Sequence, residues 1–447
     1  MKKLKLFYIL YSFSSVFIFA QLSTKHGDLK YEDFKTPEFC GVACHTDFYQ
    51  QWKQAMMSKS YTHHWDEIEY FKLAIPHAEK DEKVAEVRDG CNGCHAPISF
   101  VVGDTPPPKP ELNSRANEGV SCEVCHSISG FEGDIPFNFN YVMKPGKTKF
   151  SGRESGIQSP AHEISVSALH RTGDFCGICH NEKNPFGIWV KSTHLEWKEG
   201  PYSKEGVQCQ DCHMPKGESI IGAMGNKYPD SRQHLFHGAH DPGKVKGTIE
   251  LRIHPDLEEA EPGETVKFTV ALFNQKTGHK FPTGSVEDRI VWLQVEAIDE
   301  IGKTFHLPVD KKGFDGEEFT ISSDVNAYQD MGIAMTNPNF EGVQRDDIQL
   351  GNRIFRMPYF DPQKRMTIQQ WNTASLGVDY RIGPRETKIE TFIFNIPDNI
   401  SEGKLKITAK LFYQKLISSV GKFLNVPSEE YEALLVNEHF TTINIVD

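Results

Sequence analysis

Residues 118–126 read EGVSCEVCH and residues 205–213 read EGVQCQDCH, so one short pattern occurs twice in the chain. In each copy two residues separate two cysteines, and a histidine follows the second cysteine directly. The chain holds ten cysteines, all within residues 40–212, and they form five close pairs. A histidine follows every pair: His45, His95, His126, His180 and His213. The fold of this region must therefore accommodate five similar cysteine–histidine sites.

The spacing is the attachment signature of c-type haem. Two thiols about one helical turn apart bond to the haem, and the adjacent histidine is the proximal ligand of its iron. Zinc ribbons, thioredoxin-like motifs and structural disulfides also use paired cysteines, but none of them requires a histidine at one fixed offset. The sequence therefore predicts five covalently attached haem c groups, with the five histidines as proximal ligands. The predicted thioether residues are Cys40, Cys44, Cys91, Cys94, Cys122, Cys125, Cys176, Cys179, Cys209 and Cys212.

The first pair departs from the pattern, because three residues rather than two separate Cys40 from Cys44. The extra residue must bulge, and Gly41 and Ala43 are small enough to allow this. The alternative is a degenerate site without haem. Since both thiols and His45 are kept, we expect a haem here as well.

Aliphatic residues are distributed unevenly along the chain. Leu, Ile and Val account for 30 of the 225 residues 21–245 but for 45 of the 202 residues 246–447. So few aliphatic side chains cannot easily offset the entropy lost on ordering the first region. We expect the haems to supply its missing core, which predicts a mainly α-helical and irregular pentahaem domain over residues 21–245. The net charge of −12 argues against a nucleic-acid-binding protein.

The second region, residues 246–447, has the alternation of apolar and polar residues that is typical of strands. It is clearest over residues 266–272 and 404–411, with similar runs over residues 290–298 and 389–396. Short strands separated by turn residues predict an all-β sandwich of the immunoglobulin-like kind. Residues 310–380, rich in Asp, Asn and Gly, are expected to form long loops or to pack over the pentahaem domain.

The first twenty residues have the pattern of a secretory signal peptide. A basic start, Met1 to Lys5, precedes an apolar run from Leu6 to Phe19, with Ala20 before the expected cleavage point. The alternative is an uncleaved anchor. No later stretch is long and apolar enough to cross a bilayer. We therefore expect a mature chain without an integral membrane span in the periplasm, with the cell surface as the alternative.

The first region has more histidines than are needed to supply a distal ligand to each haem iron. Residues 21–245 contain ten histidines besides the five proximal ones. We expect two histidine ligands at most irons, a combination that gives low potentials suited to electron transfer. His240 belongs to a histidine cluster just past the last haem motif. His279 stands at a turn from which it could reach a haem, the alternative being a turn histidine packed by Phe281.

Several stretches within residues 38–241 resemble a known family, the exported multihaem cytochromes c related to the tetrahaem electron carrier of ammonia-oxidising bacteria. They are CNGCHAP, EGVSCEVCH, FCGICH, EGVQCQDCHMP and the segment from His45 to Trp52. The stretch from Thr277 to Gly284 is similar to members with a β-domain after the haems. The resemblance implies electron transfer as the activity.

The family also implies distal ligands. Its members usually carry a distal histidine five residues after the tryptophan, where this chain has Met57. The resemblance leaves three possibilities: Met57 ligates, His63 or His64 replaces it, or the iron has five ligands. It further implies His162 and His234. The full set of distal candidates is Met57, His63, His162, His234, His240 and His279.

Five haems attached between Cys40 and His213 must lie close together, which favours an electron-transfer protein. Its expected partners are other cytochromes or a quinol-linked oxidoreductase. The alternative is an enzyme that reduces or oxidises a small nitrogen or sulfur compound at a haem with an open position. The irregular first site, with Met57, is where the sequence would locate such a haem.

Overall fold

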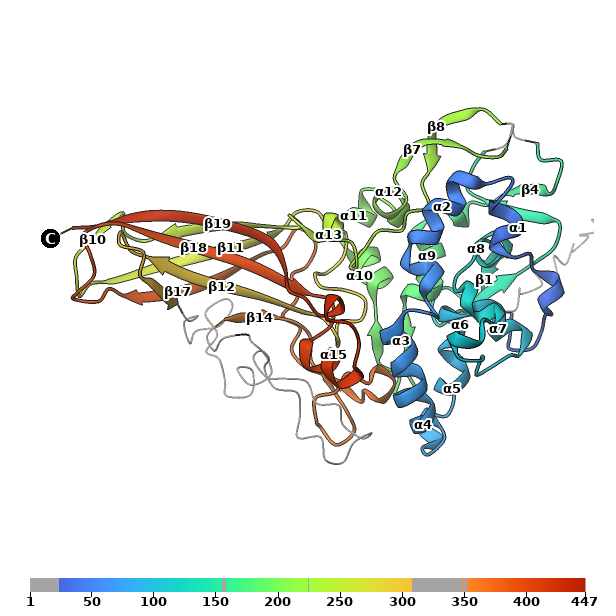
Figure 1. The fold of residues 1–447 in the computed structure, drawn as a ribbon, viewed down its shortest axis with the longest axis horizontal. Helices are drawn as coiled ribbons and strands as arrows, with labels where there is room; N and C mark the ends of the chain where they lie inside the picture. Colours follow the sequence, from blue (N-terminus) through green and yellow to red (C-terminus); the bar gives the residue numbers. More distant parts are fainter. Residues whose placement is uncertain (1–23, 155–157, 224, 308–347, 349–351, 447) are drawn as a thin grey trace, which may run out of the picture.

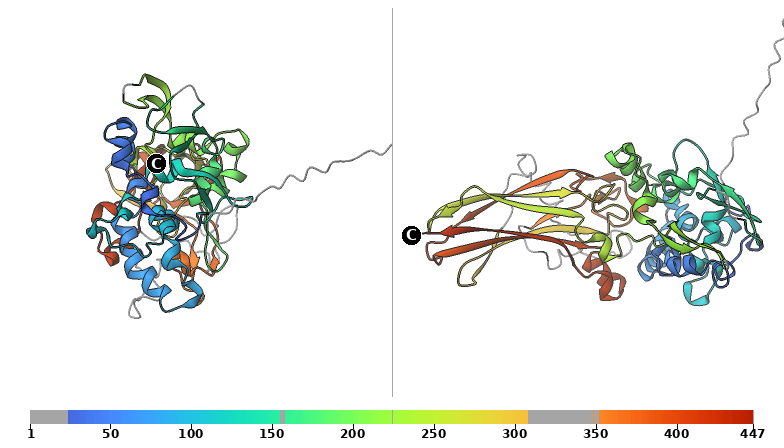
Figure 2. Two further views of the ribbon diagram at one scale, coloured as in Figure 1. Left: turned by 90° about the vertical axis from the view of Figure 1, so that its right-hand side faces the viewer. Right: turned by 90° about the horizontal axis from the view of Figure 1, so that it is seen from above.

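The computed structural model describes residues 24–154, 158–223, 225–307, 348 and 352–446. Predictions for residues 1–20 and for most of residues 310–351 lie outside the described residues. The molecule is elongated, with a helical region at one end and long strands at the other, and the C-terminus lies at the far end of the strands (Figure 1, Figure 2). No helix in the described ranges is long and apolar enough to cross a membrane.

The helices of the first region are short, because turns and cysteine motifs follow one another at close intervals. They are α1 (Pro37–Gly41), α2 (Thr46–Gln54), α3 (His64–Glu69), α4 (Ile75–Ala78), α5 (Val87–Gly90), α6 (Asn92–His95), α7 (Pro97–Val102), α8 (Cys122–Ser127), α9 (Gly173–His180), α10 (Thr193–Glu199), α11 (Pro201–Lys204), α12 (Cys209–His213) and α13 (Pro242–Val245). The 3₁₀ turn η2 (Met56–Lys59) and the π-helical turn η3 (Tyr70–Ala74) join the first of them.

Small two-stranded ribbons fill the gaps between these helices. They pair β1 (Ile128–Phe131) with β2 (Tyr141–Met143), β3 (Thr148–Ser151) with β4 (Glu163–Val166), β5 (Glu182–Lys183) with β6 (Trp189–Lys191), and β7 (Lys216–Ile220) with β8 (Lys227–Arg232). A small core of aromatic and aliphatic side chains around Phe34, Tyr141 and Ile178 lies under α7, α8 and α9. The first region is therefore mainly helical and irregular, as predicted.

The second region is a sandwich of two sheets. One has the order β10-β19-β18-β12-β13, with β14 also paired to β12, and the other has the order β17-β11-β9. The strands are β9 (Ile249–Pro255), β10 (Glu259–Ala260), β11 (Thr265–Asn274), β12 (Ile290–Ile298), β13 (Thr304–Leu307), β14 (Arg353–Phe355), β17 (Thr387–Asn395), β18 (Gly403–Gln414) and β19 (Leu434–Ile445). All pairs are antiparallel except β10 with β19.

The alternation read from the sequence corresponds to burial in the sandwich. Val266, Phe268, Val270 and Leu272 on β11 are at most 1% exposed, while the intervening side chains point outward. Together with inward side chains of the facing sheet they form one continuous core. The predicted β-sandwich is confirmed.

The two regions share a second apolar cluster where they meet. Trp65 and Leu73 from the helical region pack with Trp292 and Leu416 of the β region. Helix α15 (Ser418–Leu424) lies beside α3 at this junction (Figure 1). The short turn η10 (Ser428–Glu430) follows α15. The shared cluster holds the base of the sandwich against the haem motifs.

Candidate haem-binding sites

Four of the five cysteine motifs lie on a turn of helix. The second to fifth motifs lie on or at the start of α6, α8, α9 and α12, and each helix ends at or just after its histidine. The first motif spans the end of α1 and the start of α2. There a Cβ on Gly41 would come within 2.3 Å of the Tyr49 ring, so only glycine fits this position. A small residue is expected at Gly41 so that the motif can accommodate its extra residue. Packing against Tyr49 requires a small residue there as well.

The proximal histidines share one orientation. In four of them Nδ1 bonds to a backbone carbonyl, which turns Nε2 away from the chain. The carbonyls belong to Ile221 for His45, to Ser60 for His95 (2.8 Å), to Phe150 for His126 (2.7 Å) and to His237 for His213 (2.6 Å). Such a bond fixes the tautomer and leaves Nε2 as the metal ligand. This donor arrangement fits a haem iron at each of these sites.

Three proximal histidines face a second histidine across a gap. The ring centroids are 6.0 Å apart for His45 and His162, 6.2 Å for His126 and His234, and 6.4 Å for His213 and His279. A histidine–metal bond is about 2 Å long, so two imidazoles on opposite sides of one iron have centroids roughly 6 Å apart. The spacing of all three pairs therefore fits a shared iron.

The facing histidines have the same orientation as the proximal ones. Nδ1 bonds to a backbone carbonyl in His162 (Glu163, 3.1 Å), in His234 (Arg232, 3.0 Å) and in His279 (Lys280, 3.0 Å). Burial lowers the pKa of His234 and His213 to about 4 and that of His126 to about 3. These rings are therefore neutral at neutral pH, which is the form that binds a metal.

Two other histidines in the region have Nε2 bonded within the protein. His170 lies 6.3 Å from His126, but its Nε2 is 3.0 Å from the backbone carbonyl of Cys125. His194 has Asn181 on Nδ1 at 2.9 Å and Asp174 on Nε2 at 2.8 Å. His194 is thus bonded through both ring nitrogens and His170 through Nε2.

The remaining distal candidates lie elsewhere. The backbone carbonyl of Met57, in η2, accepts hydrogen bonds from Val120 N (2.9 Å) and Ser60 Oγ (3.1 Å). His63 and His240 lie against each other, with centroids 5.2 Å apart, rather than opposite one of the three paired proximal histidines. Iron ligation by these three residues stays a prediction.

The five motifs lie close to one another at their cysteines. The Cys40 side chain lies beside that of Cys122, and the same proximity holds for Cys94 with Cys179 and for Cys176 with Cys209. The first motif therefore lies beside the third, and the fourth lies beside both the second and the fifth. All ten thiols are free of disulfides.

A small cavity lies beside the second motif, bordered by Cys91 and His95. Three buried carboxyl groups also border it, those of Glu69, Glu287 and Asp288. Burial raises the pKa of Glu287 to about 7 and holds the pKa values of the other two well above the usual range. Sequence reasoning missed this group, because two of its members come from the β region and only the fold brings them to the motif.

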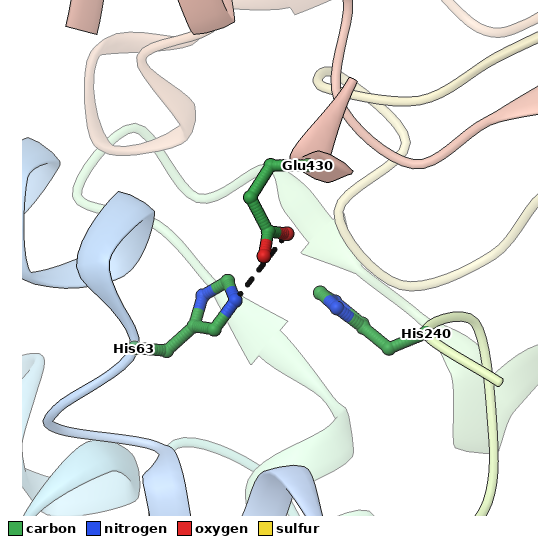
Figure 3. A group of neighbouring side chains, drawn as sticks. All are labelled: His63, His240 and Glu430. Atoms are coloured by element: carbon green, nitrogen blue, oxygen red, sulfur yellow. Dashed lines mark ion pairs between the residues drawn. The ribbon is translucent and has the colours of Figure 1, made fainter. Parts of the chain in front are cut away.

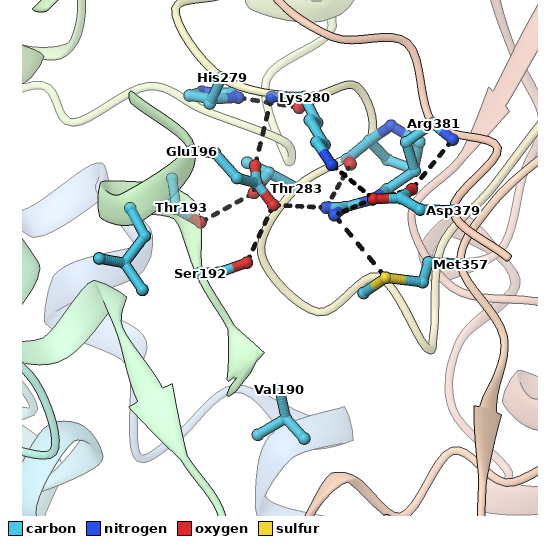
Figure 4. Close-up of polar contacts among 12 residues, drawn as sticks. Val190, Ser192, Thr193, Glu196, His279, Lys280, Thr283, Met357, Asp379 and Arg381 are labelled. Atoms are coloured by element: carbon cyan, nitrogen blue, oxygen red, sulfur yellow. Dashed lines mark hydrogen bonds and ion pairs between the residues drawn. The ribbon is translucent and has the colours of Figure 1, made fainter. Parts of the chain in front are cut away.

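A buried ionic network positions His279 (Figure 4). Glu196, on α10, accepts hydrogen bonds from the Lys280 amide (3.2 Å), the Thr283 hydroxyl (2.6 Å) and Arg381 (2.7 Å). Asp379 in turn bonds to Arg381 (2.9 Å) and to Lys280 (2.7 Å). The turn that carries His279 is thus held on the helical region.

Comparison with known proteins agrees with this geometry. Residues 40–127 match the family model for cytochrome c554 and c-prime, and residues 152–247 match the N-terminal region of the NapC/NirT cytochrome c family. A penta-haem cytochrome c552 from Thermochromatium tepidum superposes with a TM-score of 0.60 at 20% identity, covering 92% of this chain and 99% of that one. This chain has the fold of a pentahaem cytochrome c.

Two other matches among the solved structures each cover less than half of this chain. AvmM, which catalyses macrocyclization in alchivemycin A biosynthesis, covers 45% of this chain and 91% of its own at 11% identity, with a TM-score of 0.21. The CARDB domain of PF1109 from Pyrococcus furiosus covers 45% and 92% at 11% identity, with a TM-score of 0.18. Scores this low support no functional argument. A search of the curated proteins found no match.

Proposed function

We propose that this multihaem cytochrome is an exported electron-transfer protein with five covalently attached haems. The observation that carries the proposal is the set of three histidine pairs spaced at 6.0–6.4 Å. Two strong axial ligands leave no open position on an iron, so such a haem exchanges electrons and does not bind substrate. Bound haem supplies one-electron redox chemistry.

In this proposal His162, His234 and His279 are the distal ligands of the first, third and fifth haems. His63, His240 and Met57 remain candidates for the second and fourth. The protein's own residues orient the ligands through backbone carbonyls, exclude water by burial, and hold the distal histidine of the fifth site from the β region. The contacts between cysteine side chains support a path for electrons between neighbouring haems. In this path the first motif adjoins the third, and the fourth adjoins the second and the fifth.

The proposal includes export to the periplasm through the N-terminal segment and exchange of electrons with other cytochromes or a quinol-linked oxidoreductase. Coulometric titration of the purified protein tests its redox role. We expect five electrons per chain, released to an oxidised partner cytochrome without turnover of nitrite, hydroxylamine or sulfite. Rapid turnover of one of these compounds with no transfer to cytochromes would contradict it.

A matched pair of variants tests the ligand assignment. His234→Ala should convert one haem from low spin to high spin in electron paramagnetic resonance. His170→Ala should leave the spin state of every haem as it is in the wild type, because Nε2 of His170 bonds to the Cys125 carbonyl. If His170→Ala produced the high-spin signal instead, the assignment at the third site would be wrong.

A second candidate function is reduction of a small nitrogen or sulfur compound at the second haem site. The specific observation in its favour is the cavity beside His95, whose buried carboxyl groups are protonated near neutral pH and can donate protons. This differs from the expectation of an open position at the first site, where His162 faces His45. Asp288→Asn should lower the rate at which the nitrogen or sulfur compound is reduced, without altering the haem count. Asp230→Asn changes an exposed surface residue and should leave that rate unchanged.

A further inference from the structure

A cluster of metal-ligating side chains lies apart from the three histidine pairs. In it a ring nitrogen of His63, a ring nitrogen of His240 and a carboxylate oxygen of Glu430 all lie within 4.8 Å of one another (Figure 3). We propose that these three residues bind one divalent transition-metal ion in addition to the haem irons. The site adds a metal centre to the proposed electron-transfer protein. It gives His63 and His240 a role that replaces their candidate role as distal ligands of the second and fourth haems.

The orientation of His63 differs from that of the haem-type histidines. Its Nδ1 is 3.0 Å from the Asp66 carboxylate, and its Nε2 is 3.4 Å from Glu430 Oε2. A ligating histidine that bonds to a carboxylate through its second nitrogen is the usual arrangement at zinc sites. In the three histidine pairs described above, the second ring nitrogen bonds to a backbone carbonyl instead of a carboxylate. His63 therefore presents its free nitrogen to Glu430 rather than to a cysteine motif.

Two carboxylates flank the His63 ring. Its Nδ1 is 3.0 Å from Asp66 Oδ2, and its Nε2 is 3.4 Å from Glu430 Oε2. A cation held by His63 would therefore lie next to negative charge, which Arg289 and Lys415 beside His240 partly offset.

Two further groups face Glu430. Lys415 Nζ is 2.8 Å from Oε2, and His64 Nε2 is 3.3 Å from Oε1. Lys415 competes with a metal for the carboxylate, which sets the affinity below that of a site with an unpaired carboxylate. The His64 side chain is 42% exposed and can move aside. Metal binding therefore requires Lys415 to withdraw or to share the carboxylate.

The ligand set defines the class of ion. Two imidazoles and one carboxylate suit zinc, iron(II) and related transition metals rather than calcium or magnesium, which prefer oxygen ligands. His63 is 6% exposed, so protein encloses much of the site. Three protein ligands leave a fourth position for water.

The three ligands come from distant segments. His63 directly precedes α3, His240 lies just before α13, and Glu430 ends η10 in the β region. A bound metal would tie the segment after α15 to the helical region at the junction of the two. Metal binding should therefore stabilise the folded protein, since the unfolded chain does not hold these residues together.

The test uses the purified haem-loaded protein, treated with chelator, incubated with Zn²⁺ and dialysed. Elemental analysis should find one zinc per chain in the wild type, and zinc should raise its melting temperature. Glu430→Gln should lose the zinc and the shift, while Glu429→Gln, the exposed neighbour, should keep both. The haem spectra of both variants should match the wild type.

Two results would overturn the proposal. One is the absence of stoichiometric zinc from the wild type, or its equal retention by Glu430→Gln. The other is a new high-spin haem signal in His63→Ala or His240→Ala, which would identify that residue as an axial haem ligand. The isosteric Glu430→Gln change keeps the test valid if a histidine variant fails to fold.

Discussion

The two regions of this chain form their cores in different ways. Residues 246–447 carry 45 Leu, Ile and Val residues in 202, and many of those in the sandwich form one continuous buried cluster. Residues 21–245 carry 30 in 225, and their interior contains histidines and cysteine thiols instead. The comparison teaches that a low aliphatic content need not mean disorder, because a covalent cofactor can take the place of side chains.

The largest effect should follow from removing one attachment point in the helical region. In the double variant Cys176→Ser/Cys179→Ser, the fourth motif loses its haem beside the second and fifth. Amide hydrogen exchange of residues 158–223 should accelerate by roughly a hundredfold, equivalent to about 3 kcal/mol of local stability. Strands β11, β12 and β18 should keep their protection. Equal loss in both regions would show that their cores are not independent.

A substitution in the sandwich should produce the converse result. Leu293 on β12 is fully buried, so Leu293→Ala should cost about 2–5 kcal/mol in the free energy of unfolding of the β region. Chemical denaturation followed by tryptophan fluorescence measures this cost, and the haem spectrum should not change in buffer. Leu435→Ala, at a residue 36% exposed, is the control and should cost much less. A change in haem spin state in Leu293→Ala would contradict the comparison.

The smallest effect concerns the contact between the regions. Bonds to Arg381 and Lys280 outweigh burial and lower the pKa of Asp379 to about 2. A carboxyl group with a lowered pKa stabilises the fold above its unfolded value near 4, and this contribution disappears as the pH falls through 2. The stability difference between wild type and Asp379→Asn should therefore shrink by about 2 kcal/mol between pH 5 and pH 2. A difference that stays constant with pH would exclude this role.

The periodic features of the sequence predicted the fold well. Alternation over residues 266–272 and 290–298 predicted β11 and β12, because one face of each strand is buried and the other is not. The cysteine motifs predicted five haem attachment sites for a similar reason, since the chemistry of attachment requires a fixed local spacing. Both signals are local, so neither depends on knowing the tertiary structure.

The partners of the histidines could be predicted only in part. The resemblance to a family implied His162 and His234, and the structure places both opposite proximal histidines. His279 could only be suspected, because its position opposite His213 depends on the docking of the β region. The sequence around Glu287 and Asp288 did not indicate that their carboxyl groups would lie beside a haem motif, because no local sequence pattern marks a buried charged residue.

Haem in place of an aliphatic core is the central feature proposed for residues 21–245, and the mass of the denatured mature protein tests it most directly. Covalent haems remain attached after denaturation, whereas bound but unattached cofactors are lost. We expect the mass of the chain plus five haems, including one at the irregular site of Cys40 and Cys44. A mass with four haems would contradict attachment at one motif, and a mass with fewer would contradict the cofactor-built core.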